Sequence, residues 1–241
     1  MNKFFCITLF FFITGTTTAQ SLPDGYILLY QQNFSTDSAI RDFKFSHPDS
    51  WKIKTISNNR FMEFSGQSLH GPDPDSNGTL GIIKGHIFGD FILEASLMQT
   101  CRDCGLPDLC ILYSIKDSLH FYAIDLASRS TDSTHGIFLV KNAPRVKVSD
   151  QQSDSLVWGD EKWHKVRVER SIVNRMVTVY VDDMKRPVMT TKNPELIMGY
   201  LGFGSFSGSG RIDNIKVWAP TSIPEEATFF RGKGSPRAKA P

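Results

Sequence analysis

The sequence lacks the short motifs that mark several large enzyme classes. It has no G-x-S-x-G nucleophile turn, no phosphate-binding G-x-x-x-x-G-K-[ST] loop and no H-E-x-x-H zinc motif. It also has little net charge, because 27 Lys and Arg residues face 25 Asp and Glu residues. The basic surface of a nucleic-acid-binding protein is therefore not expected. No stretch shows helical periodicity over three turns, and beyond the N-terminus no stretch is apolar enough to span a membrane.

What is present begins with an export signal. Lys3 supplies a positive charge, residues 4–13 are almost wholly apolar, and small residues follow up to Ala19. This order of charge, apolar run and small residues is typical of a secretory signal peptide. The apolar run of roughly 10 residues is too short to cross a ~30 Å hydrocarbon core as a helix. We therefore predict a signal peptide over 1–19 and a secreted or periplasmic protein.

Alternating residue types indicate β-strands. Residues 165–169 alternate charged and apolar side chains, 176–182 place three valines on one face, and 171–175 form a short turn between them. Other runs of the same kind cover 26–34, 51–56, 60–64, 80–84, 90–99, 108–115, 118–126, 136–141, 186–190, 200–205 and 211–218. Many short strands separated by frequent turns predict an all-β fold, a two-sheet antiparallel jelly-roll sandwich.

The chain shows no internal repeat and no linker that divides it. We expect a single β-sandwich domain over 20–219. The stretch 142–160 is a long connection over one end of the sandwich, where functional residues often lie. Residues 220–241 contain basic side chains among Gly, Ser, Pro and Ala, and too few apolar groups to offset the entropy of ordering them. We expect them to form a flexible basic tail.

Four segments carry a resemblance to a known group of folds. Residues 199–204 and 210–217 resemble the closing strand pair of laminin-G and concanavalin A-like domains, 88–94 resembles an early strand, and 160–170 contains W-H-x-V-x-V. The chain resembles the concanavalin A-like lectin/glucanase superfamily from about residue 34 to 218. Within that superfamily it is similar to secreted bacterial proteins near the 3-keto-disaccharide hydrolase-like domain family.

The resemblance implies a carbohydrate ligand, held by a concave sheet face and the loops at its rim. The E-x-D-x-x-E strand of the laminarinase-type relatives is absent. Asp90 and Glu94 share one strand face but lie about 13 Å apart by strand rise. A retaining glycosidase needs carboxyl groups ~5 Å apart, and an inverting one ~6.5–9.5 Å. These two residues therefore do not form a catalytic pair by themselves.

Three carboxylates remain as catalytic candidates. Glu94, Asp108 and Asp125 all lie in or at the start of apolar strands. Burial raises the pKa of an unpaired carboxyl group, which suits a general acid. The alternative is a structural carboxylate that is paired or faces solvent, since structural ion pairs also perturb pKa values.

A second set of residues suits sugar recognition. His120, His135 and Arg145 lie at strand ends or in the following loop, and Trp158 lies in the long connection. Sugar sites combine a planar aromatic ring with hydrogen-bonding side chains, because sugars expose both C–H faces and hydroxyl groups. The alternative is that the polar residues are ordinary loop-edge residues and that the tryptophan belongs to the core.

The cysteines of the mature chain are Cys101, Cys104 and Cys110. In an oxidising compartment their close spacing predicts a disulfide that leaves one thiol over, with a three-thiolate zinc site as the alternative. Residues 73–78 read D-x-D-x-N-G, but Lys84 stands where a calcium loop has Glu. We therefore expect no metal and no cofactor, with a weak calcium site as the alternative to a polar surface loop.

Three functional hypotheses follow. The first is a secreted carbohydrate-binding or glycan-processing β-sandwich whose partner is a carbohydrate, without a nucleic-acid partner or a membrane span. The second is a glycoside hydrolase that acts through a carboxylate pair, with Glu94 opposite Asp108 or Asp125. The third is a non-catalytic cell-surface or assembly module. The sequence leaves the oligomeric state open.

Overall fold

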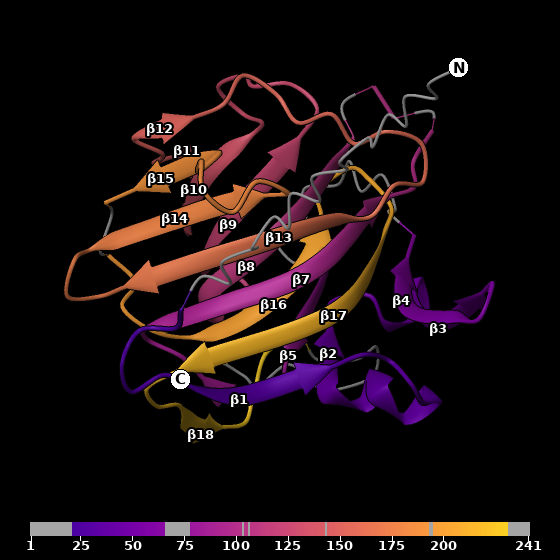
Figure 1. Cartoon of the computed structure of the whole chain (residues 1–241), viewed down its shortest axis with the longest axis horizontal. Helices are drawn as coiled ribbons and strands as arrows, with labels where there is room; N and C mark the ends of the chain where they lie inside the picture. Colours follow the sequence, from indigo (N-terminus) through magenta and orange to yellow (C-terminus); the bar gives the residue numbers. More distant parts are fainter. Residues whose placement is uncertain are drawn as a thin grey trace, which may run out of the picture.

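A computed structural model of the chain describes residues 21–65, 78–102, 104–105, 107–142, 144–192 and 195–230 (Figure 1). The predicted signal peptide, 1–19, lies outside the described residues, as does 73–77 of the calcium-like loop. Within the described ranges, no helix combines the length and the apolar character that crossing a membrane requires.

In the described part of the chain, one sheet contains seven strands. Their spatial order is β11 (Val146–Lys147), β10 (Gly136–Lys141), β9 (His120–Ala127), β8 (Asp108–Asp117), β16 (Tyr200–Ser205), β5 (Thr79–Ile83) and β2 (Phe43–Phe45). Neighbouring strands pair antiparallel throughout this sheet.

A second antiparallel sheet contains nine strands within the described residues. Eight follow the order β12 (Gln151–Gln152), β15 (Met189–Thr191), β14 (Met176–Val181), β13 (His164–Ser171), β7 (Phe91–Gln99), β17 (Gly210–Ala219), β4 (Asn59–Phe64) and β3 (Trp51–Ile56). The ninth, β1 (Ile27–Gln32), pairs with β17. A small ribbon joins β6 (Gly85–Ile87) to β18 (Ile223–Glu225), and two short 3-10 helices are η1 (Asp37–Asp42) and η2 (Pro48–Ser50).

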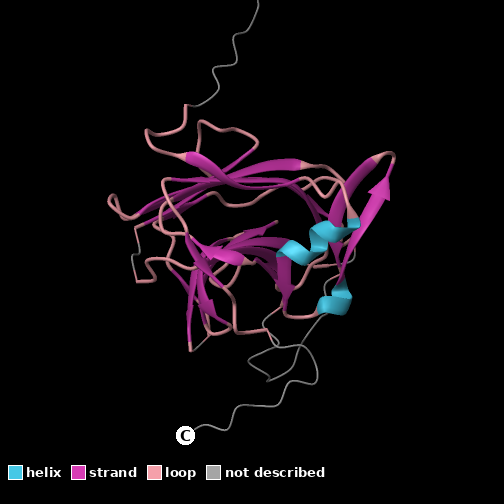
Figure 2. Ribbon diagram, turned by 90° about the horizontal axis from the view of Figure 1, so that it is seen from below, coloured by secondary structure: helices cyan, strands magenta, loops and turns pink. Residues whose placement is uncertain are grey.

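The alternation in the sequence explains how the sheets pack. In β13, Val166 and Val168 are fully buried, while Lys165 between two buried neighbours is exposed. Apolar side chains from both sheets, such as Val168 and Ile111, belong to one core cluster. Figure 2 shows the sheets as two layers around this core. The predicted all-β, two-sheet antiparallel sandwich is confirmed.

Two predicted hairpins are present. Ser171 pairs with Met176 at the end of the β13–β14 hairpin, and Asp117 pairs with His120 at the β8–β9 turn. The sequence did not reveal the shortest strands, β2, β6, β11, β12 and β18, because two or three residues carry too little periodicity to be recognised.

The connection 142–160 closes one side of the sandwich. It contributes β11 to the edge of the seven-stranded sheet, where Val148 N–H donates to the Ile137 carbonyl oxygen at 2.7 Å. It then crosses to the nine-stranded sheet, where Asp150 N–H donates to the Thr190 carbonyl oxygen at 2.9 Å, and forms β12. One polypeptide stretch therefore links the edges of both layers.

The outer face of the seven-stranded sheet carries a second apolar cluster, which the C-terminal segment covers. Ala227 is buried in this cluster, and Phe229 packs against it with its ring 5.7 Å from that of Tyr200. Lys44 Nζ donates to the Ala227 carbonyl oxygen at 2.6 Å. The expectation of a free tail from residue 220 is therefore wrong for residues 220–230, because their apolar side chains have a sheet face to bury. The remainder, 231–241, lies outside the described residues.

Candidate functional site

Strand register brings two of the predicted carboxylates together. Cys110 of β8 pairs with Asp125 of β9, which in turn pairs with Gly136 of β10, and Asp108 opens β8 two residues earlier. One ligand atom from each of Asp108, Cys110 and Asp125 lies within 4.8 Å of the other two, and all three residues are buried. This acidic cluster lies on the outer face of the seven-stranded sheet.

Asp108 is a structural acceptor. Its Oδ1 accepts hydrogen bonds from Ser205 Oγ at 2.9 Å and from Ser207 Oγ at 2.7 Å. Its two oxygens also accept from the main-chain N–H groups of Phe206 at 2.9 Å and Ser207 at 3.1 Å. The carboxylate therefore holds the turn that follows β16, and both of its oxygens are engaged.

Asp125 has a different environment. Its partner of opposite charge is Arg145, whose Nη1 lies 3.0 Å from Asp125 Oδ2, and among the described residues neither carboxylate oxygen has a side-chain hydrogen bond of normal geometry. The residue is 1% exposed. Burial first, and then the neighbouring Asp108, raise the pKa of Asp125 to about 7, although Arg145 acts in the opposite direction. Loss of hydration therefore outweighs the ion pair.

Arg145 lies between aromatic rings and a loop. Its guanidinium carbon is 4.6 Å from the centre of the Phe138 ring and 4.2 Å from that of Phe206. Its Nη2 donates to the main-chain oxygen of Ser133. The half-buried arginine thus ties the β9–β10 loop to Asp125, and it approaches both rings in the way that guanidinium groups favour.

The third predicted carboxylate is elsewhere, and a catalytic role for it opposite Asp108 or Asp125 is wrong. Glu94 lies on the outer face of the nine-stranded sheet, because its neighbours Leu93 and Ala95 point into the core. Its carboxylate forms ion pairs with Lys165 and Arg167, each at 2.9 Å. Glu94 therefore belongs to a surface ion-pair network.

The remaining pair, Asp108 and Asp125, has the spacing but lacks the access that glycoside hydrolysis needs. Oxygens of the two carboxylates lie within 4.8 Å, near the separation of about 5 Å in retaining enzymes. However, Asp108 is 2% exposed and Asp125 1%, so a glycosidic oxygen and a water molecule cannot reach them in this conformation. Asp108 therefore has a structural role, and in this conformation the pair is closed to a substrate.

The same residues do not fit a metal ion either. Asp108 is saturated by hydrogen bonds, and the cation of Arg145 already faces Asp125. Burial, together with Asp125 and Asp108, raises the pKa of the Cys110 thiol well above its usual value, which disfavours the thiolate that zinc needs. We therefore derive no metal chemistry from this cluster.

Two of the three cysteines in the described residues form a disulfide. Cys101 and Cys104 are bonded, with their Cα atoms 5.7 Å apart, and Cys110 is a buried free thiol. The predicted disulfide with one thiol left over matches this arrangement. The alternative three-thiolate zinc site is wrong, because two of its ligands are oxidised to the disulfide.

The structure places the two predicted histidines away from any shared binding surface. His120 starts β9, so five residues and about 16 Å of strand separate it from Asp125, and its ring contacts Asp117 and Asn142. His135 is fully buried, with Nε2 3.0 Å from Ser153 Oγ, and burial lowers its pKa. The His135 imidazole is therefore closed to a ligand, while the His120 side chain is 27% exposed but lies at the opposite end of β9 from Asp125, the partner of Arg145.

The prediction that Trp158 is an exposed platform for stacking a sugar ring is wrong. Its side chain belongs to the core cluster and is only 4% exposed. The indole Nε1 donates to the Leu126 carbonyl oxygen at 3.1 Å, and the ring contacts His164 edge-on. Trp158 therefore anchors the long connection to the end of β9.

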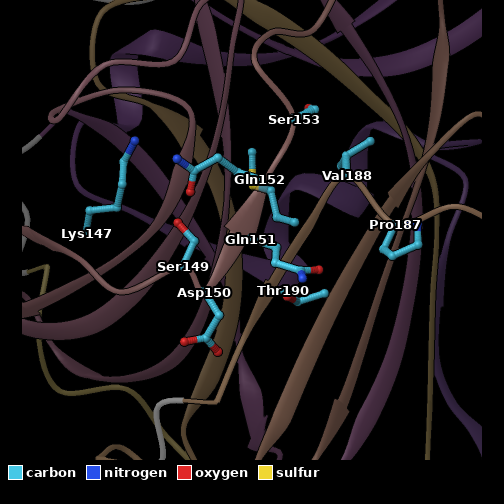
Figure 3. Close-up of a pocket in the computed structure, with 10 residues that line it drawn as sticks. Lys147, Ser149, Asp150, Gln151, Gln152, Ser153, Pro187, Val188 and Thr190 are labelled. Carbon is cyan, nitrogen blue, oxygen red and sulfur yellow. The ribbon is translucent and has the colours of Figure 1, made fainter.

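The long connection forms a surface cavity with β15, which we call cavity A. It has a volume of about 740 Å³ and is lined by residues 147, 149–153 and 187–190. Figure 3 shows Lys147, Ser149 and Gln152 on one side and Pro187 and Val188 on the other. Cavity A therefore has one polar and one apolar wall.

The polar groups of cavity A differ in whether they already form hydrogen bonds within the protein. Lys147 Nζ donates to the Thr134 and His135 carbonyl oxygens, at 3.0 and 3.2 Å, and is thus committed to the protein. Gln151 is exposed, and within the described part of the chain its amide makes no hydrogen bond. Asp150 accepts from Lys192 N–H through Oδ2 alone. Gln151 and Asp150 therefore offer donors and acceptors to a ligand.

The fold has counterparts among solved structures. A carbohydrate-binding module, CBM66 from Bacillus subtilis, matches with a TM-score of 0.54 and 11% identity, over 74% of this chain and 96% of that chain. A seed lectin of Lotus tetragonolobus matches with a TM-score of 0.50 and 11% identity, over 83% of this chain and 100% of that chain. The chain has a lectin-like jelly-roll fold.

Another lectin-like match is a Bacillus subtilis protein of unknown function with a galectin-like fold. Its TM-score is 0.52 at 12% identity, over 82% of this chain and 97% of that chain. No family model and no curated protein match the sequence. The predicted concanavalin A-like fold is thus confirmed by structure, while membership of the superfamily and of the narrower hydrolase-like family stays a prediction.

Cavity A has only a weak signal in the sequence. The stretch 142–160 is predicted to be a long connection suited to function, but Gln151 and Gln152 form no motif. Their pairing with Thr190 and Met189 of β15 depends on register between segments distant in sequence. A polar, uncharged pair in a long loop is the signal that the sequence contains, whereas the residue predicted in this stretch is Trp158.

Proposed function

We propose that this chain is an exported carbohydrate-binding module that holds a glycan in cavity A without cleaving it. The observation that carries this proposal is the two-sided lining of cavity A. Gln151, Gln152 and Ser149 offer hydrogen-bonding groups, and Pro187 and Val188 offer apolar surface opposite them. Sugars present the same combination of hydroxyl groups and C–H faces, so both walls find complementary groups.

Two further points support this function. The similar solved structures include a carbohydrate-binding module and a seed lectin by name. The buried Asp108–Asp125 pair is closed to solvent, which favours binding over hydrolysis. Export rests on the predicted signal peptide at 1–19.

The test is a glycan array on the purified protein, with calcium and with a chelator, followed by calorimetry and product analysis on each hit. Gln151→Ala removes one neutral hydrogen-bonding group and should weaken binding about 2- to 10-fold. Gln31→Ala is the matched control, because Gln31 is also an exposed strand glutamine but lies on β1.

Each result has a defined meaning. Binding that falls in the Gln151→Ala protein alone, with the glycan recovered unchanged, supports a binding module with its site at cavity A. Equal affinities for the two variants would remove cavity A as the site. Release of a sugar product that stops in Asp125→Asn would replace the proposal with a glycoside hydrolase.

A further inference from the structure

A second cavity lies on the same connection as cavity A. This cavity B has a volume of about 560 Å³ and lies between the disulfide loop, the start of the β9–β10 loop and residues 156–161. Ser153 lines cavity A and Leu156 lines cavity B. Three residues of extended chain span at most about 11 Å, so the two cavities adjoin along one strip of backbone. Figure 1 shows this connection from β12 to β13 passing along the rim of the sandwich.

The strip shared by the two cavities is fixed by hydrogen bonds. Ser153 N–H donates to the Val188 carbonyl oxygen at 2.8 Å, and Ser130 N–H donates to the Asp154 carbonyl oxygen at 2.8 Å. Leu156 N–H donates to the Ala127 carbonyl oxygen at 3.2 Å. The buried Trp158 adds its indole bond to β9. A surface that is ordered before binding loses less entropy when a ligand arrives.

The lining of cavity B repeats the two-sided chemistry of cavity A. Arg102 and Glu161 form an ion pair at 3.3 Å with 75% and 52% of their side chains exposed, so their outer atoms remain available to hydroxyl groups. Val157 is 81% exposed and presents an apolar side chain beside them. Because Val157 is so exposed, core packing does not explain its apolar character.

We propose that cavities A and B are adjoining subsites for one oligosaccharide, so that the chain selects a saccharide of several units over a single sugar. This inference rests on the proposed function and specifies its ligand class. Neighbouring subsites on one rigid strip add their contacts without a second loss of translational freedom. Affinity should therefore rise with saccharide length until both cavities are filled.

The experiment is calorimetric titration of the purified protein with saccharides of the malto-, cello-, laminari-, xylo- and fructo- series. Each series runs from the monosaccharide to the hexasaccharide. In the series that binds, we expect affinity to increase about tenfold or more between the shortest and longest members. Val157→Ser should remove most of that increase, lowering affinity for the longest member about three- to tenfold while leaving the shortest unchanged. Gln151→Ala should weaken every length.

Val173→Ser is the matched control, because Val173 is 87% exposed at the tip of the β13–β14 hairpin. Neither valine is packed, so both variants should fold, and circular dichroism and thermal melting verify this. Length-independent affinity, or equal behaviour of the two valine variants, would overturn the two-subsite inference while leaving binding at cavity A intact. No binding by any series, together with a silent glycan array, would overturn both proposals.

Discussion

Arg145 Nη1 lies 3.0 Å from Asp125 Oδ2, while the same guanidinium donates to the Ser133 carbonyl oxygen. The next two residues form β11, and the chain then continues into the polar wall of cavity A. The ion pair therefore anchors the start of the connection 142–160 to a central strand. Its strength depends on the ionisation of a buried carboxyl group, which gives the first prediction.

Asp125→Asn should remove a pH dependence of stability. The folded-state pKa of Asp125 is about 7, above the value of about 3.9 for an unfolded chain. The folded protein thus binds more protons than the unfolded chain between these values, and its stability falls as pH rises through that window. The slope is up to about 1.4 kcal/mol per pH unit. Urea unfolding from pH 4 to pH 8 measures it.

The pH profile of the variant is needed because His135 changes the pH dependence of stability in the opposite direction to Asp125. Burial lowers the pKa of His135, so its contribution to stability is lost as pH falls below about 6.5. Subtracting the free energy of unfolding of the Asp125→Asn protein from that of the wild type at each pH removes the contribution of His135. Asp117→Asn is the control, since the Asp117 side chain is 47% exposed. Parallel pH profiles for wild type and Asp125→Asn would contradict the prediction.

Asp108→Ala should destabilise the fold strongly. The change removes the acceptor of the Phe206 N–H group and one of the two acceptors of the Ser207 N–H group, which also donates to Ser205 Oγ. It also removes the carboxylate that accepts from the Ser205 and Ser207 hydroxyls. Each buried unsatisfied donor costs about 1–3 kcal/mol, so a loss of about 2–5 kcal/mol is expected in chemical denaturation. Asp108→Asn keeps one acceptor oxygen and should lose less. An Asp108→Ala protein as stable as wild type would show that the turn does not depend on this carboxylate.

Removal of residues 221–241 should expose the outer face of the seven-stranded sheet. Ala227, Phe229 and Phe230 pack on its apolar cluster, and deletion also removes the acceptor of Lys44 Nζ. We expect increased binding of the dye ANS and aggregation in size-exclusion chromatography. Removal of 232–241 alone takes away no described contact and serves as the control. Identical chromatograms for the two truncations would contradict the packing.

The double change Cys101→Ser/Cys104→Ser should have a modest effect on stability. A closed loop of about four residues contributes about 2 kcal/mol by the chain-entropy relation. Because Cys101 lines cavity B, the affinity for long saccharides should fall more than the affinity for short ones. Reductant should reproduce both effects in wild type and change nothing in the variant. A reductant effect on the double variant would point to another cause.

Much of the fold was readable from local pattern. Alternation at 165–169 and 176–182 predicts the β13–β14 hairpin, and the runs 91–93 and 110–113, apolar on both faces, predict the central strands β7 and β8. In β8, Ile111 belongs to the core between the sheets and Leu112 to the apolar cluster on the outer face. Period-two patterning is local, so sequence reveals it directly.

The site was harder to predict, because it depends on non-local relationships. Alternation says that Glu94 and its apolar neighbours face opposite ways, but not which sheet Glu94 joins. The approach of Asp108 to Asp125 follows from strand register, which includes irregularities such as the one between Tyr113 and Asp117. The burial of Trp158 depends on one carbonyl group, that of Leu126, more than thirty residues earlier. Neither register nor such partners are encoded locally.

The C-terminal segment that lies on the outer sheet face acts as a competitor built into the chain. Because it is covalently attached, its effective concentration at that face is in the range of millimolar for flexibly tethered groups. A free ligand that binds the same surface would have to displace this segment, and its apparent affinity would be lower for that reason. Among the described residues this segment does not line cavity A at the rim of the sandwich, so a ligand bound there would not have to displace it.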